Sequence, residues 1–235
     1  MKYFVFLILL LFLSGCVFQE KEVMHENKTQ EVGNESLPKP IEKQTQPDVY
    51  DLRKVEIREY EGNKLDSIVD VRDLSIKGPQ YVDIDSYKLK ITGLIENPIN
   101  LTYNEVLSNQ KYRKVIWIHC VTGWSAEVLW EGILLKELFD EVNVKPEANT
   151  VIFYAVDGYT TSLPLDYIIE KDILLADKIN NVTIPPERGY PFELVAEDKL
   201  GYKWIKWVEK IELSDDPDYR GYWEKRGYSN TADVE

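Results

Sequence analysis

The feature that most constrains the fold is the pattern of short, mixed elements between residues 87 and 213. Segments with the alternating apolar and polar residues of half-buried strands are interleaved with short segments whose apolar residues recur at helical spacing. Short strands mixed with short helices are typical of an α+β domain rather than of a doubly wound sheet. The pattern therefore predicts mixed sheets with short helices, and the roughly 180 residues from 55 to 235 suffice for a single domain.

Local signals predict the individual elements. "LTYNEVLSNQ" begins a short helix, because Thr102 and Glu105 have the spacing of a capping box. "NTVIFYAVDGYTTSLPL" forms two strands joined around Asp157 and Gly158, since Asp-Gly is a strong hairpin signal. The other expected strands are 87–95, 114–120, 126–132, 191–198 and 202–213, and the other expected helices are 133–144 and 165–172.

The first residues have the features of a secretion signal. Lys2 precedes an apolar run that is too short to span a bilayer, and small residues then lead into Cys16. The tetrapeptide "LSGC" resembles the lipobox of secreted lipoproteins, whose cysteine becomes the lipidated first residue of the mature chain. We expect residues 1–15 to be a signal peptide and Cys16 to be lipidated, with an uncleaved anchor or an ordinary signal peptide as alternatives. Each of these places the rest of the chain at the extracytoplasmic face of the cell membrane.

The segment that follows has the composition of a tether. It is rich in Glu, Lys, Gln, Asn and Pro and shows almost no apolar period. Such a segment buries too little apolar surface to offset the entropy of ordering it. We therefore expect residues 16–54 to be a disordered tether and residues 55–235 to be the folded domain.

The charge balance limits the choice of partner. The chain has 41 acidic and 28 basic residues, a formal net charge of -13, and no dense local cluster of Lys and Arg. Because such a chain repels phosphate backbones, the sequence predicts that nucleic acid is not a partner.

Cys120 is the one cysteine outside the first residues, and it adjoins His119, the one histidine in the predicted domain. If Cys16 carries lipid, Cys120 has no intramolecular disulfide partner, so its thiol is buried, reactive or metal-bound. In the expected strand Ile116, Ile118 and Cys120 share one face and His119 lies on the other, which argues against a direct Cys–His dyad. Periodicity alone leaves a core cysteine and a functional one both open.

The inventory of other residues excludes several chemistries. A His-based zinc site needs three or four ligands, and the domain offers no further His or Cys. A carboxylate-rich metal site stays open, although no Asp or Glu spacing indicates one. The G-x-S-x-G elbow, the phosphate-binding G-x-x-x-x-G-K-[ST] loop, the haem motif C-x-x-C-H and iron–sulfur spacings are all absent from the sequence.

The surroundings of Cys120 carry a family resemblance. "HCVTGWSAEVLWEGILLKELF", "FYAVDGYTTSLPLDYII", "DILLADKINN", "PPERGYPFELV", "GYKWIKWVEKIEL" and "YRGYWEKRGYS" occur in this order. Together they resemble the sulfite oxidase-like molybdopterin-dependent oxidoreductases, over almost the whole domain from about residue 70. The resemblance implies the sulfite oxidase-type fold and a molybdenum (or tungsten) pyranopterin cofactor. It also implies that Cys120 gives its thiolate to the metal, for which a soft sulfur is a suitable ligand.

Other residue roles follow from the same resemblance. Tyr159 would lie near the metal and hydrogen-bond a ligand or the substrate, with a plain hairpin aromatic as the alternative. The segment from Arg188 to Lys203 resembles one that holds the pterin and its phosphate, with surface cations as the alternative. The residues expected to bind the cofactor are Lys77, Gly78, Arg188, Gly189, Gly201 and Lys203.

The chain also departs from the family pattern. Glu193 stands where many relatives have an arginine, and "AEDKLGYK" replaces a "P-G-K-Y-G" turn. These acidic residues weaken a phosphate site unless Arg188, Lys199 and Lys203 compensate. The arginine that sulfite oxidases carry after the metal cysteine is also missing from "VTGWS", which argues against a dianionic substrate such as sulfite.

The leading hypothesis is a lipid-anchored molybdenum or tungsten enzyme that transfers oxygen atoms to or from a small-molecule substrate. Because the chain has no haem or iron–sulfur ligands, a separate membrane or soluble electron carrier is expected as a partner. The alternative is a non-catalytic cell-surface lipoprotein of the same fold that binds a ligand or partner. A third hypothesis, a thiol-dependent hydrolase or redox protein, requires a base near Cys120.

Overall fold

The protein was analysed as a computed structural model that describes residues 49–69 and 74–234. These residues fall within one compact unit, Thr45–Glu235. The predicted signal peptide, Cys16 and most of the predicted tether lie outside the described residues.

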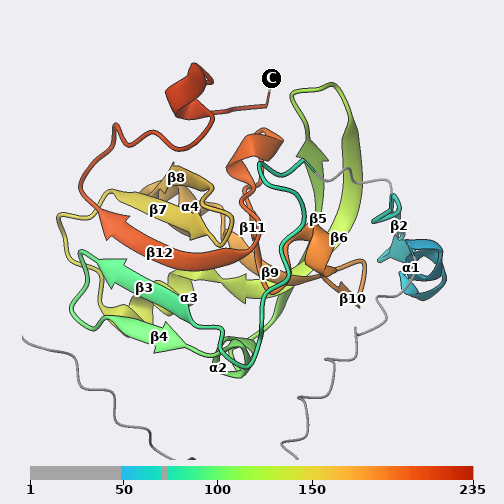
Figure 1. The fold of residues 1–235 in the computed structure, drawn as a ribbon, viewed down its shortest axis with the longest axis horizontal. Helices are drawn as coiled ribbons and strands as arrows, with labels where there is room; N and C mark the ends of the chain where they lie inside the picture. The colour runs from blue at the N-terminus through green and yellow to red at the C-terminus, as the bar shows by residue number, and fades with distance from the viewer. Residues whose placement is uncertain (1–48, 70–73, 235) are drawn as a thin grey trace, which may run out of the picture. The chain divides into compact units, whose positions relative to one another are not determined.

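Two five-stranded sheets form the framework of the described part of the chain (Figure 1). In the first sheet the order is β10-β9-β6-β5, β11 also pairs with β9, and every pair is antiparallel. Its strands are β5 (Tyr112–His119), β6 (Ser125–Leu134), β9 (Leu174–Ile179), β10 (Val182–Thr183) and β11 (Glu193–Val195).

The second sheet has the order β4-β3-β12-β7-β8, in which β3 and β12 run parallel and the other pairs are antiparallel. The parallel pair joins β3 and β12, which are far apart in the sequence. Because β12 pairs with β3 on one side and with β7 on the other, the last strand of the chain links the two halves of the sheet. Its strands are β3 (Leu89–Gly93), β4 (Ile99–Leu101), β7 (Thr150–Ala155), β8 (Thr160–Pro164) and β12 (Val208–Ser214). A separate ribbon pairs β1 (Glu59–Tyr60) with β2 (Asn63–Lys64).

The helices in the described residues are short, as predicted. The capping box of α2 is present: Glu105 N–H donates to Thr102 Oγ1 at 3.2 Å, and Thr102 N–H donates to Glu105 Oε2 at 2.7 Å. The α-helices are α1 (Val49–Val55), α2 (Tyr103–Leu107), α3 (Leu135–Val142) and α4 (Leu165–Glu170), and the 3₁₀ turns are η1 (Pro186–Arg188), η2 (Gly201–Lys203) and η3 (Glu224–Arg226).

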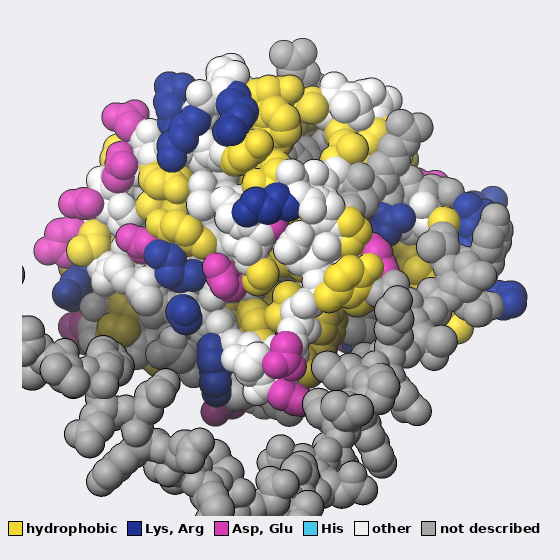
Figure 2. Space-filling view, viewed as in Figure 1, with side chains coloured by type: hydrophobic (Ala, Val, Ile, Leu, Met, Phe, Trp, Pro, Cys, Tyr) yellow, Lys and Arg dark blue, Asp and Glu magenta, His cyan; other side chains and the backbone are white. Residues whose placement is uncertain are grey.

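Charges of both signs share the face shown in Figure 2, where Lys and Arg side chains stand among exposed apolar groups and acidic residues gather toward one margin. In the described part of the chain, no helix has both the length and the apolar character that a membrane-spanning helix requires.

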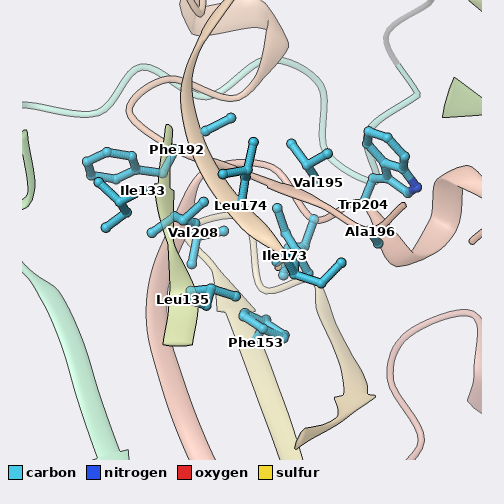
Figure 3. Packing of buried hydrophobic residues seen from close by; sticks show 14 of the residues in the cluster. Ile133, Leu135, Phe153, Ile173, Leu174, Phe192, Val195, Ala196, Trp204 and Val208 are labelled. Atoms are coloured by element: carbon cyan, nitrogen blue, oxygen red, sulfur yellow. The ribbon is translucent and has the colours of Figure 1, made fainter. Parts of the chain in front are cut away.

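The core lies between the elements of the two sheets. Figure 3 shows Ile133 and Leu174 of the first sheet close to Phe153 and Val208 of the second. All four side chains are fully buried, and each contributes roughly 1.5–3 kcal/mol by leaving water. This core fixes the relative positions of the strand ends and turns that form the site described below.

The structure confirms the predicted α+β class and the hairpin around Asp157 and Gly158, and it corrects three boundaries. The predicted tether extended to residue 54, but residues 49–55 form α1, because Leu52 is buried in the core. Ile133 and Leu134 end β6 rather than begin a helix.

The predicted strand 202–213 is extended only over β12 (Val208–Ser214). Its first residues belong to η2 and to a connection that ends at Trp207, whose φ of 52° interrupts an extended backbone. This irregular connection decides which side chains of the segment reach the site.

Candidate cofactor and active site

A cavity of about 510 Å³ lies where the end of β5, the β7–β8 turn, η2 and the C-terminal segment meet. Ligand pockets commonly measure about 300–1,000 Å³ and are lined mainly by apolar and aromatic groups, as this one is. Its lining residues are Leu74, Ser75, Ile76, Ile118, Cys120, Val121, Thr122, Trp124, Asp157, Tyr159, Glu193, Gly201, Tyr202, Trp204, Ile205, Lys206, Trp207, Tyr222, Trp223 and Tyr228.

Cys120 lies directly after β5, at the start of a tight turn on the cavity wall. Its N–H donates to Trp124 O at 2.9 Å, and Gly123 N–H donates to Cys120 O at 3.0 Å. Gly123 has a φ of +88°, which glycine adopts without steric cost. The Cys120 sulfur lies 3.1 Å from Thr122 Oγ1, and Cys120 is partly exposed, so this residue belongs to the cavity wall rather than to the hydrophobic core.

Strand alternation separates Cys120 from its histidine neighbour, as the sequence predicts. Ile116 and Ile118, on the predicted cysteine face, are buried in the core. Trp117 and His119 stack on each other with ring centroids 6.0 Å apart, and Trp117 is 45% exposed. The geometry therefore gives no support to a direct Cys120–His119 nucleophile–base pair.

Gly201 places η2 beside the end of β5. A Cβ at Gly201 would lie 3.4 Å from His119 O and 3.8 Å from Cys120 Cα, and Leu200 forms a parallel bridge with His119. Gly201, which the sequence analysis assigned to the cofactor, lines the cavity and adjoins the backbone around Cys120.

Tyr159 reaches the cavity from the β7–β8 turn. Its N–H donates to Asp157 Oδ1 at 2.9 Å, which fixes the turn, and its hydroxyl donates to Tyr202 O at 2.5 Å. Burial, and then the negative charges of Glu224 and Asp157, raise the pKa of Tyr159 far above its ordinary value. The phenol is therefore neutral at physiological pH and acts as a hydrogen-bond donor.

The charges on the cavity wall come from residues that the sequence reasoning did not assign as contacts. Asp157 and Glu193 are buried acids, and among the described lining residues Lys206 is the cation. Gly189 packs against Lys206, because a Cβ at Gly189 would lie 3.2 Å from Lys206 Cβ. The predicted cofactor residue Gly189 thus makes room for the lysine that lines the cavity.

Three other predicted residues are not among the residues that line the cavity. Arg188, in η1, donates from Nη2 to Val69 O at 3.2 Å. Lys77 Nζ lies 3.4 Å from the position that a Cβ on Gly158 would take, so Lys77 adjoins the β7–β8 turn, and Gly78 follows it. The residues just before Lys77, numbers 74–76, line the cavity.

Lys203 points away from the cavity into the interior. Its Nζ donates to Ser162 O at 3.0 Å, Glu224 Oε1 at 2.6 Å and Asn230 Oδ1 at 3.2 Å, which uses all three N–H donors. Burial lowers the pKa of Lys203, although the charge of Glu224 acts in the opposite direction. This position does not support the predicted contact between Lys203 and the pterin.

The C-terminal segment supplies lining residues that the sequence reasoning missed. Tyr222, Trp223 and Tyr228 line the cavity, although "YRGYWEKRGYS" was used only as part of a family resemblance. The high density of aromatic residues in this segment, which has neither strand nor helix periodicity, is the sequence signal that could have indicated a role in the cavity lining.

The lining suits a metal that is bound through one thiolate and otherwise by a cofactor. No group of three or more His, Cys, Asp or Glu side chains within residues 49–69 and 74–234 is placed to hold a metal by itself. Cys120 presents a soft sulfur, Lys206 presents a cation, and the buried Trp124 Nε1 has no hydrogen-bond acceptor among the described residues. A metal–pterin group fits these residues, because it supplies the remaining metal ligands and polar acceptors.

Fold and cavity together define an α+β cofactor-binding domain with a cysteine at the cavity wall. The family described as "Oxidoreductase molybdopterin binding domain" matches residues 76–223. The chain belongs to this family: it is an oxidoreductase, and its cofactor is a molybdenum pterin.

Similar proteins show how far the likeness extends. "Uncharacterized oxidoreductase YuiH" of Bacillus subtilis (strain 168) is 34% identical over 156 residues, which cover 66% of this chain and 78% of that protein. "Protein-methionine-sulfoxide reductase catalytic subunit MsrP" of Gluconobacter oxydans (strain 621H) is 31% identical over 147 residues, which cover 55% of this chain and 47% of that protein.

Among solved structures, the sulfane dehydrogenase SoxCD from Paracoccus pantotrophus matches with a TM-score of 0.57 and 24% identity. The match covers 59% of this chain and 41% of that chain, and it supports the fold alone.

Proposed function

We propose that this chain is an extracytoplasmic, lipid-anchored enzyme that transfers an oxygen atom to or from a small substrate. One observation carries the proposal: the Cys120 sulfur stands on the wall of a cavity that is lined mainly by apolar and aromatic side chains. The Cys120 thiolate is the protein's ligand to the metal. When bound, the molybdenum pterin supplies the two-electron redox chemistry, and the protein orients the group and controls access to it.

A substrate XO takes up two electrons and two protons and yields X and water, and oxidation of X by water is the reverse. The sequence has no haem motif and no set of cysteines for an iron–sulfur cluster, so a separate carrier in the membrane or in solution exchanges the electrons.

The cavity favours an uncharged substrate. Asp157 and Glu193 place buried acids on its wall, and Lys206 is the cation among the described lining residues. A dianion such as sulfite would be repelled by these acids, whereas a neutral sulfoxide or N-oxide would pack against the aromatic rings. Sulfoxides are the first substrates to assay, because relatives are named as methionine sulfoxide reductases.

Other residues of the chain bind the cofactor and line the substrate cavity. Tyr159 offers a neutral phenol at the cavity wall, and Lys206 holds the anionic end of the pterin. Gly201 lines the cavity beside the backbone that carries Cys120.

The proposed location rests on the first residues of the sequence. The "LSGC" tetrapeptide after an apolar run directs lipidation of Cys16, and two or three acyl chains hold a protein stably at a membrane. Full-length Cys16→Ser should move from the membrane fraction to the soluble fraction. An unchanged distribution would overturn the lipid anchor without affecting the proposed chemistry.

The chemistry is tested on full-length protein from a host supplied with both molybdenum and tungsten. We expect close to one metal and one pterin per chain, and reductant-driven turnover of sulfoxides or N-oxides in preference to oxyanions. A metal content below about a tenth of the chain concentration, in a host that makes the cofactor, would refute the proposal that this chain is a metal-dependent enzyme. If sulfite is the one substrate that is turned over, the proposal that the cavity favours an uncharged substrate is refuted.

A further inference from the structure

The C-terminal strap, which we define as residues 219–234, forms one wall of the cavity. In Figure 1 this red segment leaves the end of β12 and runs through the short turn η3 to the C-terminus. It contributes Tyr222, Trp223 and Tyr228 to the lining. Since η3 is its only regular element in the described residues, the strap depends on contacts with the rest of the domain for its position.

An aromatic chain runs along this wall. The ring centroids of Tyr159 and Tyr222 are 5.6 Å apart, those of Tyr222 and Trp223 are 5.3 Å apart, and those of Trp223 and Tyr228 are 5.2 Å apart. Tyr202 closes the series at 5.3 Å from Tyr228. A displacement of the strap would therefore alter the wall from Tyr159 to the exposed rim at Tyr228.

The strap is attached to the domain by a buried ion pair. Glu224 of the strap accepts from Lys203 Nζ at 2.6 Å, and both side chains are fully buried. Thr161 Oγ1 of β8 donates to the same Glu224 oxygen at 2.8 Å. Lys203 also donates to Asn230, so this lysine holds the strap at two positions while its third bond, to Ser162 O, holds it to β8.

The backbone of the strap follows the same course. Tyr222 N–H donates to Thr160 O at 2.8 Å. A Cβ at Gly221 would lie 2.2 Å from Thr160 O, so the strap lies directly on β8 at a point where only glycine fits. The ion pair is thus located under the aromatic wall, between β8 and η2.

We propose that Lys203 and Glu224 are positioning residues, which hold the aromatic wall of the substrate cavity in place and do not contact the pterin. Removing one partner leaves the other charge buried and unpaired between β8 and the part of the strap from Tyr222 to Asn230, so this part loosens first. The end of the strap is held separately, by the bonds from Leu200 N–H to Ala232 O and from Val234 N–H to Asp198 O. The proposal rests on the proposed function only in that the wall faces the substrate.

The test compares Glu224→Gln with a matched control in the cofactor-loaded full-length protein. The control is Glu131→Gln: Glu131 is also buried and pairs with two cations, Arg113 at 2.6 Å and Lys178 at 2.8 Å, but it does not line the cavity. Hydrogen exchange should become about tenfold faster or more in strap amides of Glu224→Gln, with β5, β6 and β9 unchanged. The control should leave strap exchange unchanged.

Two further readouts separate positioning from cofactor binding and from general stability. In Glu224→Gln we expect the KM for a neutral oxo-substrate to rise about fivefold or more, with molybdenum and pterin content unchanged. In Lys203→Met/Glu224→Gln the unpaired charge is gone, so the unfolding midpoint should recover toward wild type while strap exchange stays fast.

Several outcomes would overturn the proposal. Unchanged hydrogen exchange in the strap amides of Glu224→Gln would show that the ion pair does not hold the strap in place. Exchange that becomes equally faster in β5, β6 and β9 would show that the pair only contributes to the stability of the whole domain. Loss of pterin from Lys203→Met with normal strap exchange makes Lys203 a cofactor ligand. If wild-type protein turns over no substrate, the proposed function fails, but strap exchange and pterin content still decide the role of the pair.

Discussion

Replacing Tyr159 with phenylalanine tests whether its hydroxyl acts on the substrate or only supports the fold. The hydroxyl donates to Tyr202 O at 2.5 Å, so the substitution leaves that carbonyl without this donor. A net loss of about 1 kcal/mol follows from one hydrogen bond of this kind. For a domain of this size that corresponds to a decrease of about 2–4 °C in the melting temperature.

The effect on activity should be much larger than the effect on stability. The phenol has one proton, which it donates to Tyr202 O in this structure. If it turns from Tyr202 O to the substrate oxygen as charge develops there, its removal lowers kcat/KM by about 100-fold, the loss found when one such donor is deleted. The assay is steady-state reduction of a sulfoxide or N-oxide, with molybdenum and pterin content measured on the same preparation.

Tyr87→Phe is the matched control for Tyr159→Phe. Tyr87 is buried, and its hydroxyl donates to the backbone carbonyl of Val208 at 2.6 Å, but it does not line the cavity. We expect a similar decrease in melting temperature with unchanged kcat/KM. If Tyr159→Phe and Tyr87→Phe both retain wild-type kcat/KM, the substrate role assigned to Tyr159 is refuted.

Three further perturbations test other parts of the site. Gly201→Val should lower the pterin content of purified protein, because a Cβ at this position is already in van der Waals contact with His119 O, at 3.4 Å, and the two further methyl groups of valine crowd the cavity wall beside Cys120. Retention of full pterin content would contradict this expectation. Lys206→Met should lose pterin during gel filtration while Lys203→Arg retains it, and the opposite order would show that Lys203 is the contact. Burial acts to raise the pKa of Glu131, but hydrogen bonds from Lys178 and Arg113 outweigh it and the pKa is lowered. A carboxyl whose pKa is lower in the folded state stabilises the fold above its unfolded pKa, near 4.3, and loses that contribution as pH falls through the folded pKa. Urea unfolding from pH 7 to pH 3 should therefore show a smaller acid loss of stability in Glu131→Gln than in wild type, and equal losses would contradict the pairing.

Local signals predicted the elements that local interactions decide. The spacing of Thr102 and Glu105 predicted the start of α2, because both capping bonds form within four consecutive residues. Asp157 and Gly158 predicted the β7–β8 turn for the same reason. The alternation in β5 predicted that Cys120 and His119 point to different faces, and the structure places Trp117 and His119 together on the solvent side.

Tertiary contacts decided what the sequence left unpredicted. Lys203 and Lys206 are three residues apart in one apolar segment, and the irregular backbone from η2 to Trp207 turns the first into the interior and the second toward the cavity. The aromatic wall depends on a strap that returns to β8 from the far end of the chain. No local period marks such a contact, so neither the wall nor its attachment through Glu224 follows from the sequence alone.

The most direct test of the account is X-ray absorption at the metal edge, comparing wild-type protein with Cys120→Ser. We expect the variant to lose one sulfur from the first coordination sphere of the metal and to keep the sulfurs that the pterin supplies. An identical sulfur shell in the two proteins would contradict the assignment of Cys120 as the protein's ligand to the metal.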